Sequence, residues 1–118
     1  MKKILKIAAL LFAIATASAQ AQVAPKSFDQ CSRCHSVGVD GKNKNGPRLH
    51  RIVGAPAAKV LGFKYSQALI EAAPRWDEKT LDAWIADPKT LIPGNKMRYG
   101  GEKDASKRAE IIAWLKAN

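Results

Sequence analysis

The 118-residue chain has few cysteines, few acidic residues and no strand-like segment, and each shortage excludes a class of protein. Its two cysteines lie three positions apart, so a disulfide between them would close a tiny loop and add little stability. A disulfide-stapled domain is therefore excluded. No stretch alternates apolar and polar residues as a half-buried strand does, which argues against a sheet. No internal repeat or low-complexity linker is present, and the length suits a single domain.

The first residues predict a cleaved secretory signal rather than part of the fold. Three lysines precede an apolar run that is shorter than the roughly 20 residues a membrane-spanning helix needs. Small residues then offer cleavage sites after Ala19 or after Ala21. We predict a signal peptide at 1–19 (alternatively 1–21), one mature domain at 20–118, and no stable membrane insertion after cleavage. A retained membrane anchor is the alternative.

Basic residues outnumber acidic ones by 20 to 10, which gives a net charge of +10 at pH 7. The signal carries three lysines and no acidic residue, so its removal leaves +7. A chain this basic should meet acidic surfaces, because charge steers encounter. We predict no nucleic-acid partner, since the basic residues are scattered, form no known nucleic-acid motif and belong to an exported chain.

Short helices separated by long loops are the predicted secondary structure, which makes the fold class all-α. The expected helices run from Pro25 to about Cys34, from Ser66 to Ala73, from Asp77 to the residue before Pro88, and onward from Asp104. Asp77 and Asp104 can serve as N-caps. Glycine, asparagine and proline punctuate the remaining segments, which predicts loops. A domain of about a hundred residues with so little regular structure needs an additional source of stability. A large apolar cofactor enclosed by the helices would supply it.

Residues 31–35, Cys-Ser-Arg-Cys-His, form the C-x-x-C-H signature of covalent haem attachment. On a helical turn, Cys34 lies three positions and His35 four positions after Cys31, so all three side chains point to one side. The two thiols can add across the haem vinyl groups, and the imidazole can then meet the iron. We therefore predict one covalent haem c.

Rival interpretations of the cysteine pair are weaker. A thioredoxin-like redox site needs a βαβ setting, and the sequence has none. A zinc site normally takes four ligands. His50 is the only other histidine and no other cysteine exists, so those ligands are lacking.

Met97 is the predicted sixth ligand of the iron. Once Met1 leaves with the signal, Met97 is the only methionine of the mature chain. It follows a Pro-Gly turn in a segment without helical period, so it is no obvious core residue; gap filling is the alternative. Histidine and methionine together suit electron transfer, because thioether sulfur favours the reduced iron. His50 is the other candidate ligand, and we interpret it as a surface histidine.

With these motifs in place, the chain resembles the class I c-type cytochromes, the group of mitochondrial cytochrome c and bacterial cytochrome c2. The resemblance covers nearly all of the mature chain. It is carried by the haem motif and by Gly46-Pro47-x-Leu49-His50, Gly62-Phe63-x-Tyr65-Ser66, Trp76, Leu81, Pro88, Ile92-Pro93-Gly94-x-Lys96-Met97 and Ile111-Ile112-Ala113-Trp114-Leu115-Lys116. The implied fold is the small cytochrome c fold, with short helices and loops wrapped around one haem.

The resemblance also implies roles for three further residues. The Pro47 carbonyl would accept the second ring N–H of His35. Tyr65 and Trp76 would donate hydrogen bonds to a haem propionate. The predicted haem-binding residues are therefore Cys31, Cys34, His35, Pro47, Tyr65, Trp76 and Met97, with His35 and Met97 as iron ligands.

Three positions depart from the family pattern. Ala55 stands where many relatives have a propionate-binding arginine, and Arg48 or Arg51 is a candidate substitute. Leu69 stands where many relatives have an asparagine near a buried water, and Trp84 occupies a site that relatives usually give to a tyrosine near the methionine ligand. We expect these changes to alter the potential of the iron, because the groups around a metal tune it.

The predicted function is that of a soluble, exported electron carrier in a bacterial periplasm, not of an enzyme. We expect a monomer that meets redox proteins through their acidic docking surfaces, with Lys44, Lys96 and Arg98 as candidate contacts. The alternative is a haem enzyme or oxidoreductase subunit of the peroxidase or sulfur-oxidation type. That chemistry needs a vacant iron position and a distal acid–base group. A sensing module ranks last, since no second domain could receive its signal.

Overall fold

The computed structural model describes residues 9–11 and 23–118. The candidate cleavage sites at Ala19 and Ala21 lie outside the described residues, so the boundary of the signal peptide stays a prediction. Within the described part of the chain, no helix is both long enough and apolar enough to cross a membrane.

The described chain is helical, which confirms the predicted all-α class. Its elements are the 3-10 turn η1 (Lys26–Phe28) and the helices α1 (Asp29–Ser32), α2 (Gln67–Ala72), α3 (Glu78–Ala86), α4 (Pro88–Leu91) and α5 (Ala105–Lys116). Among residues 23–118 the only sheet-type pairing is an isolated bridge between Pro56 and Arg75.

Carboxylate caps fix where the two longest helices begin. The Asp77 side chain accepts a hydrogen bond from the Thr80 N–H at 2.7 Å, ahead of α3. The Asp104 side chain accepts one from the Ser106 N–H at 2.9 Å, ahead of α5. These hydrogen bonds lower the pKa of both carboxyls, because they favour the charged form. Both predicted caps are confirmed.

Helix α4 is the element that the sequence does not predict. Pro88 is expected only to end the preceding helix, and α3 does end at Ala86. Pro88 then occupies the first turn of α4, capped by the Asp87 side chain, which accepts from the Thr90 N–H at 3.2 Å. Proline is well tolerated at that position, because the first N–H groups of a helix have no partner inside it.

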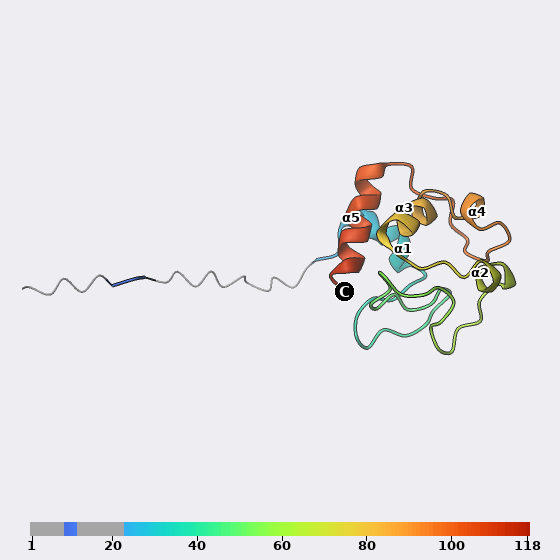
Figure 1. Ribbon diagram of the computed structural model, residues 1–118, viewed down its shortest axis with the longest axis horizontal. Helices are drawn as coiled ribbons and strands as arrows, with labels where there is room; N and C mark the ends of the chain where they lie inside the picture. Colours follow the sequence, from blue (N-terminus) through green and yellow to red (C-terminus); the bar gives the residue numbers. More distant parts are fainter. Residues whose placement is uncertain (1–8, 12–22) are drawn as a thin grey trace, which may run out of the picture.

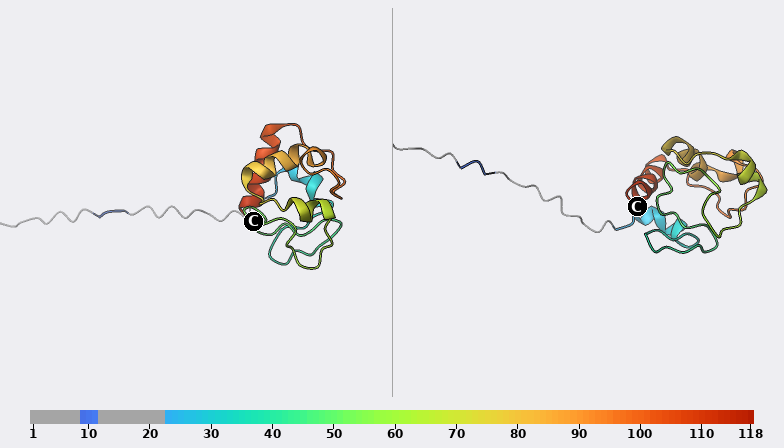
Figure 2. Two further views of the ribbon diagram at one scale, coloured as in Figure 1. Left: turned by 45° about the vertical axis from the view of Figure 1, so that its right-hand side comes forward. Right: turned by 60° about the horizontal axis from the view of Figure 1, so that its bottom comes forward.

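The helices are arranged around a common centre (Figures 1 and 2). Helix α5 packs against α3 and against η1, and α3 also contacts α4. Phe28 of η1 lies beside Trp114 of α5, with ring centroids 6.4 Å apart. The long connection between α1 and α2 runs along the bottom of Figure 1 and closes that side of the molecule.

The apolar core is built from residues of η1, α2, α3, α5 and the loops between them. Its buried members are Phe28, Ile52, Ala57, Leu69, Trp76, Leu81, Ile85, Ile92, Ile111, Ile112 and Leu115. Ile111 is the most buried of them, at 1% exposure. Helix α5 is therefore anchored through the middle of its inward face.

Ile111→Ala should lower the free energy of unfolding by about 2–5 kcal/mol, since it removes buried carbon atoms and leaves a void. The milder Ile111→Val should lower it by about 1 kcal/mol. Urea unfolding followed by circular dichroism measures both. An alanine variant as stable as the unchanged protein would contradict the buried position of this side chain.

Candidate haem-binding site

A cavity of about 500 Å³ lies inside the ring of helices, and residues of η1, α1, α2, α3 and α5 line it. Most of its lining is apolar. These apolar side chains include Phe28, Leu49, Ile52, Phe63, Leu69, Trp76, Leu81, Ile85, Ile111 and Leu115. Folded interiors leave few voids larger than a water molecule, so a space of this size in so small a domain implies a large apolar ligand.

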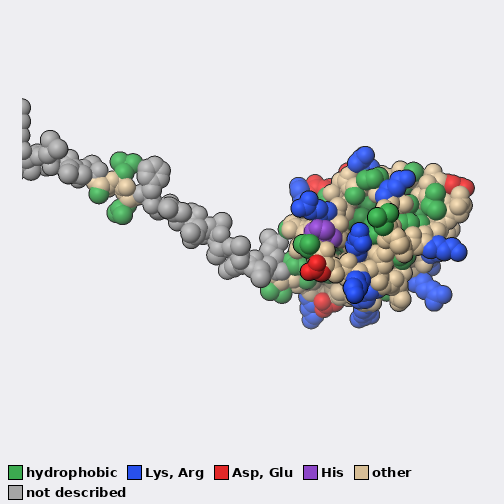
Figure 3. Space-filling model, turned by 90° about the horizontal axis from the view of Figure 1, so that it is seen from below, with side chains coloured by type: hydrophobic (Ala, Val, Ile, Leu, Met, Phe, Trp, Pro, Cys, Tyr) green, Lys and Arg blue, Asp and Glu red, His purple; other side chains and the backbone are tan. Residues whose placement is uncertain are grey.

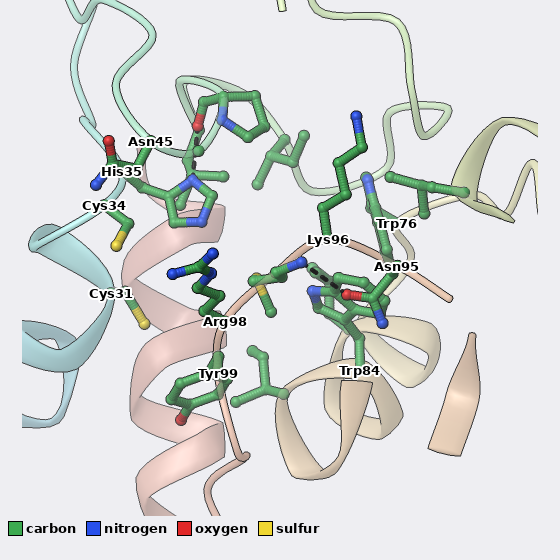
Figure 4. Close-up of a pocket in the computed structure, with 18 of the residues that line it drawn as sticks. Cys31, Cys34, His35, Asn45, Trp76, Trp84, Asn95, Lys96, Arg98 and Tyr99 are labelled. Carbon is green, nitrogen blue, oxygen red and sulfur yellow. Dashed lines mark hydrogen bonds between the residues drawn. The ribbon is translucent and has the colours of Figure 1, made fainter. Parts of the chain in front are cut away.

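The cysteine pair and the neighbouring histidine project into this cavity from one helical turn (Figure 4). The N–H groups of Cys34 and His35 both donate to the Cys31 carbonyl, at 3.1 and 3.0 Å. Both cysteines are free. Burial, and then the neighbouring Cys34, raises the pKa of the Cys31 thiol to about 11. Such a thiol is protonated at neutral pH, unlike the reactive thiolate of a dithiol redox site.

The His35 ring is fixed by a single strong contact. Its Nδ1 lies 2.7 Å from the Pro47 carbonyl oxygen, and a carbonyl can only accept, so Nδ1 carries the proton. The lone pair of the ring is then on Nε2. Burial lowers the pKa of His35, which keeps the imidazole neutral and able to bind a metal. The structure thus brings His35 and Pro47 into the relation that the family resemblance implies.

Gly46 is a site residue whose role the sequence does not predict. A Cβ atom at this position would lie 2.3 Å from Cε1 of the His35 ring and 2.6 Å from its Nδ1. The Gly46 N–H also donates to the Cys34 carbonyl at 2.8 Å, which pulls the loop against the haem motif. The Gly-Pro pair at 46–47 is the signal that could have found it.

Tyr65 and Trp76 both line the cavity on the side of the long loop. The Tyr65 hydroxyl accepts a hydrogen bond from the Val60 N–H at 3.1 Å, so its own proton is available to a ligand. Burial raises the pKa of Tyr65, which keeps it a donor. Trp76 is buried and is held through its backbone, whose N–H and C=O bond to Ala55 and Gly54 at 2.8 and 2.7 Å. Their predicted role as propionate donors remains a prediction.

Met97 also lines the cavity, on the segment between α4 and α5. Asn95 positions this segment. Its side-chain oxygen accepts from the Met97 N–H at 2.9 Å, and its amide nitrogen donates to the carbonyls of Pro88 and Ile92 at 3.0 and 2.8 Å. No sequence motif marks Asn95 as a site residue, because its three partners come within hydrogen-bonding distance only in the folded loop.

The residues that depart from the family pattern lie at different places relative to the cavity. Leu69 and Trp84 line the cavity, and the Trp84 ring lies 5.2 Å from that of Trp76. Neither candidate substitute for the arginine missing at Ala55 lines the cavity, but Arg48 is partly buried and lowers the pKa of Tyr65, whereas Arg51 is exposed. Arg48 is therefore the better candidate.

His50 is partly exposed, and its Nδ1 is buried without a hydrogen-bond partner among the described residues. It lines a shallow surface pocket together with residues of the following turn and of the end of α5. The interpretation of His50 as a surface histidine stays a prediction. His50 is not part of the cavity lining, so it is not placed to act as the second iron ligand.

The residues around the cavity fit a haem. Two thiols and a neutral imidazole lie at one wall, a thioether is available on another segment, and the remaining lining is mostly apolar. A small all-α fold built around such a cavity defines the class of c-type cytochromes.

Comparison with known proteins agrees with this class, although no family model matches the chain. The chain is 45% identical over 94 residues to cytochrome c2 iso-2 of Magnetospirillum fulvum, covering 80% of this chain and 97% of that protein. It is 40% identical over 108 residues to cytochrome c2 of Blastochloris viridis, covering 91% and 85%. The solved structure of cytochrome cH from Methylobacterium extorquens matches with a TM-score of 0.72 at 39% identity, covering 79% and 93%. The chain belongs to the class I c-type cytochromes.

Gly46→Ala should displace the His35 ring, because the added carbon would overlap it. We expect a severalfold lower yield of haem-loaded protein and an altered visible spectrum. Gly100→Ala is the matched control, since its added carbon meets nothing within 4 Å and its φ is not positive. A Gly46→Ala protein with the yield and spectrum of the control would show that the close approach is unimportant.

Proposed function

We propose that the protein is an exported electron carrier that holds one covalent haem c with His35 and Met97 as iron ligands. The observation that carries the proposal is the central cavity, whose lining combines both thiols of the C-x-x-C-H motif, a neutral His35 with a free Nε2 and the only methionine of the predicted mature chain. A bound haem supplies a one-electron couple at its iron.

The chain's own residues would hold this group and shield it. Cys31 and Cys34 supply thiols for two thioether bonds, and Pro47 keeps the His35 ring oriented by accepting from Nδ1. The apolar walls exclude water from the cavity. A dry site disfavours extra charge at the metal and so favours the reduced iron.

Tyr65 and Trp76, two hydrogen-bond donors, line the cavity, and one arginine lies near Tyr65 outside the lining. Tyr65 and Trp76 have donors to offer to carboxylates there, and Arg48 adds a positive charge close to Tyr65. We propose that these three residues together hold the haem propionates. Arg48 would thereby replace the arginine that relatives have at the position of Ala55.

An encounter with an acidic redox partner is the use we propose for the positive charge. Residues 33–64 alone carry seven basic residues and one acidic residue. Figure 3 shows lysine and arginine side chains spread over the face that is seen from below, with few acidic ones among them. Lys96 and Arg98 are exposed at the cavity itself, and Lys44 lies beside the haem motif, where it bonds the Ser32 carbonyl at 2.9 Å. Such spread charge steers weak, short-lived encounters.

An enzymatic role has less support from the same lining. Catalysis at a haem needs a distal group that can move a proton. Among the described residues, the cavity lining has no aspartate, no glutamate and no histidine other than His35, and the proposed ligand Met97 would fill the iron position that such catalysis needs vacant. We therefore infer electron transfer rather than peroxidase-type chemistry.

Met97→Leu should abolish the weak red absorption band that an iron–sulfur bond gives the oxidised protein. It should also lower the midpoint potential, because thioether sulfur stabilises the reduced iron. Lys96→Ala is the control, since Lys96 is the exposed neighbour of Met97 in the same loop. A Met97→Leu protein that retains the red band would refute Met97 as the ligand.

Lys96→Glu and Arg98→Glu should each slow oxidation by hexacyanoferrate severalfold at low salt, and the difference should vanish at high salt. Lys116→Glu makes the same change of charge on α5, outside the cavity lining, and should have a smaller effect. Stopped-flow kinetics at several ionic strengths measure these rates. Equal slowing by all three variants would show that only the net charge matters and that electrons do not pass through the cavity edge near Lys96 and Arg98.

A further inference from the structure

The side chain of Gln30 joins three segments at the edge of the cavity. Its Oε1 accepts a hydrogen bond from the Tyr99 hydroxyl at 2.6 Å. Its Nε2 donates to the Ser27 carbonyl at 2.8 Å and to Oε2 of Glu102 at 3.1 Å. A carbonyl and a carboxylate can only accept, so both amide hydrogens are used and the oxygen is left for Tyr99. We call Gln30, Tyr99 and Glu102 the clasp.

The clasp connects the two parts of the chain that would hold the iron and the thioethers. Gln30 directly precedes Cys31, and Tyr99 comes two residues after Met97, although 69 positions separate Gln30 from Tyr99. Both Gln30 and Tyr99 line the cavity. The hydrogen bond therefore crosses from the Met97 segment to the haem-motif helix.

The far end of the clasp is fixed to the helices. The Glu102 N–H donates to the Ile85 carbonyl of α3 at 2.8 Å. The Glu102 carbonyl accepts from Arg108 of α5 at 3.0 Å, and Arg108 in turn bonds Asp82 of α3 at 2.8 Å. The Arg108 side chain is 14% exposed, whereas that of Asp82 is 49% exposed, so the ion pair is only partly shielded from solvent. Backbone and side-chain contacts to α3 and α5 thus hold Glu102 in place.

Packing, and a single hydrogen bond, hold the segment between Met97 and Glu102. Tyr99 packs against the core, and Gly101 lies so close to the Ala86 backbone that an added Cβ would be 2.1 Å from its carbonyl oxygen. Within the described chain, the Tyr99 hydroxyl makes the only hydrogen bond from residues 98–101. Asn95 secures the other side of Met97, as described above. We therefore expect opening of this segment to begin between Met97 and Glu102, where the Tyr99 hydroxyl makes the only hydrogen bond of the described residues 98–101.

We propose that the clasp keeps the Met97 segment closed over the cavity and sets how readily the Met97 sulfur is displaced by an outside ligand. This inference rests on the proposed ligation by Met97. In the open form of the segment, the Tyr99 hydroxyl and the Gln30 amide would bind water instead of each other. Loss of their hydrogen bond would therefore destabilise only the closed form and raise the population of the open one. Gln30, Tyr99 and Glu102 are positioning residues in this proposal.

Tyr99→Phe and Gln30→Leu in the haem-loaded protein test the clasp. Tyr99→Phe should speed the binding of imidazole to the oxidised iron, and the amide hydrogen exchange of residues 97–101, by about fivefold, the factor expected for one hydrogen bond. Gln30→Leu should have at least this effect, because it also removes the contacts of Gln30 with Ser27 and Glu102. The double variant should be no faster than Gln30→Leu alone, since that change already removes the Tyr99 contact. Ser27→Ala is the control: it removes the 3.0 Å contact from Ser27 Oγ to Glu110 and leaves the Ser27 carbonyl, and hence the clasp, in place.

Tyr99→Phe and Gln30→Leu proteins with the imidazole and exchange rates of the Ser27→Ala protein would overturn the clasp. So would additive effects in the double variant, because these would mean two independent local changes. The proposed ligation fails separately: an unchanged protein without the red band would refute Met97 as ligand, while the exchange of residues 97–101 still reports on the clasp.

Discussion

The central cavity is the constraint on which the rest of the structure depends. Many side chains of the apolar core also face the cavity instead of only one another. They include Phe28, Leu81, Ile85, Ile111 and Leu115. The helices are short, and an isolated helix of this length is marginal in water. We therefore infer that this chain gains stability by packing around a large apolar cofactor, and that cofactor binding and folding are coupled.

The two walls of the cavity are held by different means. On one side, Gly46 makes room for the His35 ring and the Pro47 carbonyl orients it, so position follows from a few short contacts close in sequence. On the other side, Asn95 and the clasp hold a segment that lacks regular structure. The first wall joins residues close in sequence and packs Gly46 directly against the ring, whereas the clasp joins residues 69 positions apart, so we expect the site to open on the second side.

Much of the fold and of the site could be predicted from sequence, because the signals are local. The haem motif, the caps Asp77 and Asp104, and the approximate helices follow from spacing and residue type. The seven predicted site residues do surround one cavity, though their roles as ligands stay predictions. Pro88 misleads because a proline can end one helix and begin the next. Gln30, Asn95 and Gly46 escape notice because each acts through partners that only the folded chain brings near.

The intact mass of the purified, exported protein under denaturing conditions tests the central claim most directly. Thioether bonds survive denaturation, so the account predicts a mature polypeptide heavier by one haem, in both its unchanged and chemically reduced forms. The mass of the polypeptide alone, or of the polypeptide less two hydrogens for a disulfide between Cys31 and Cys34, would contradict it.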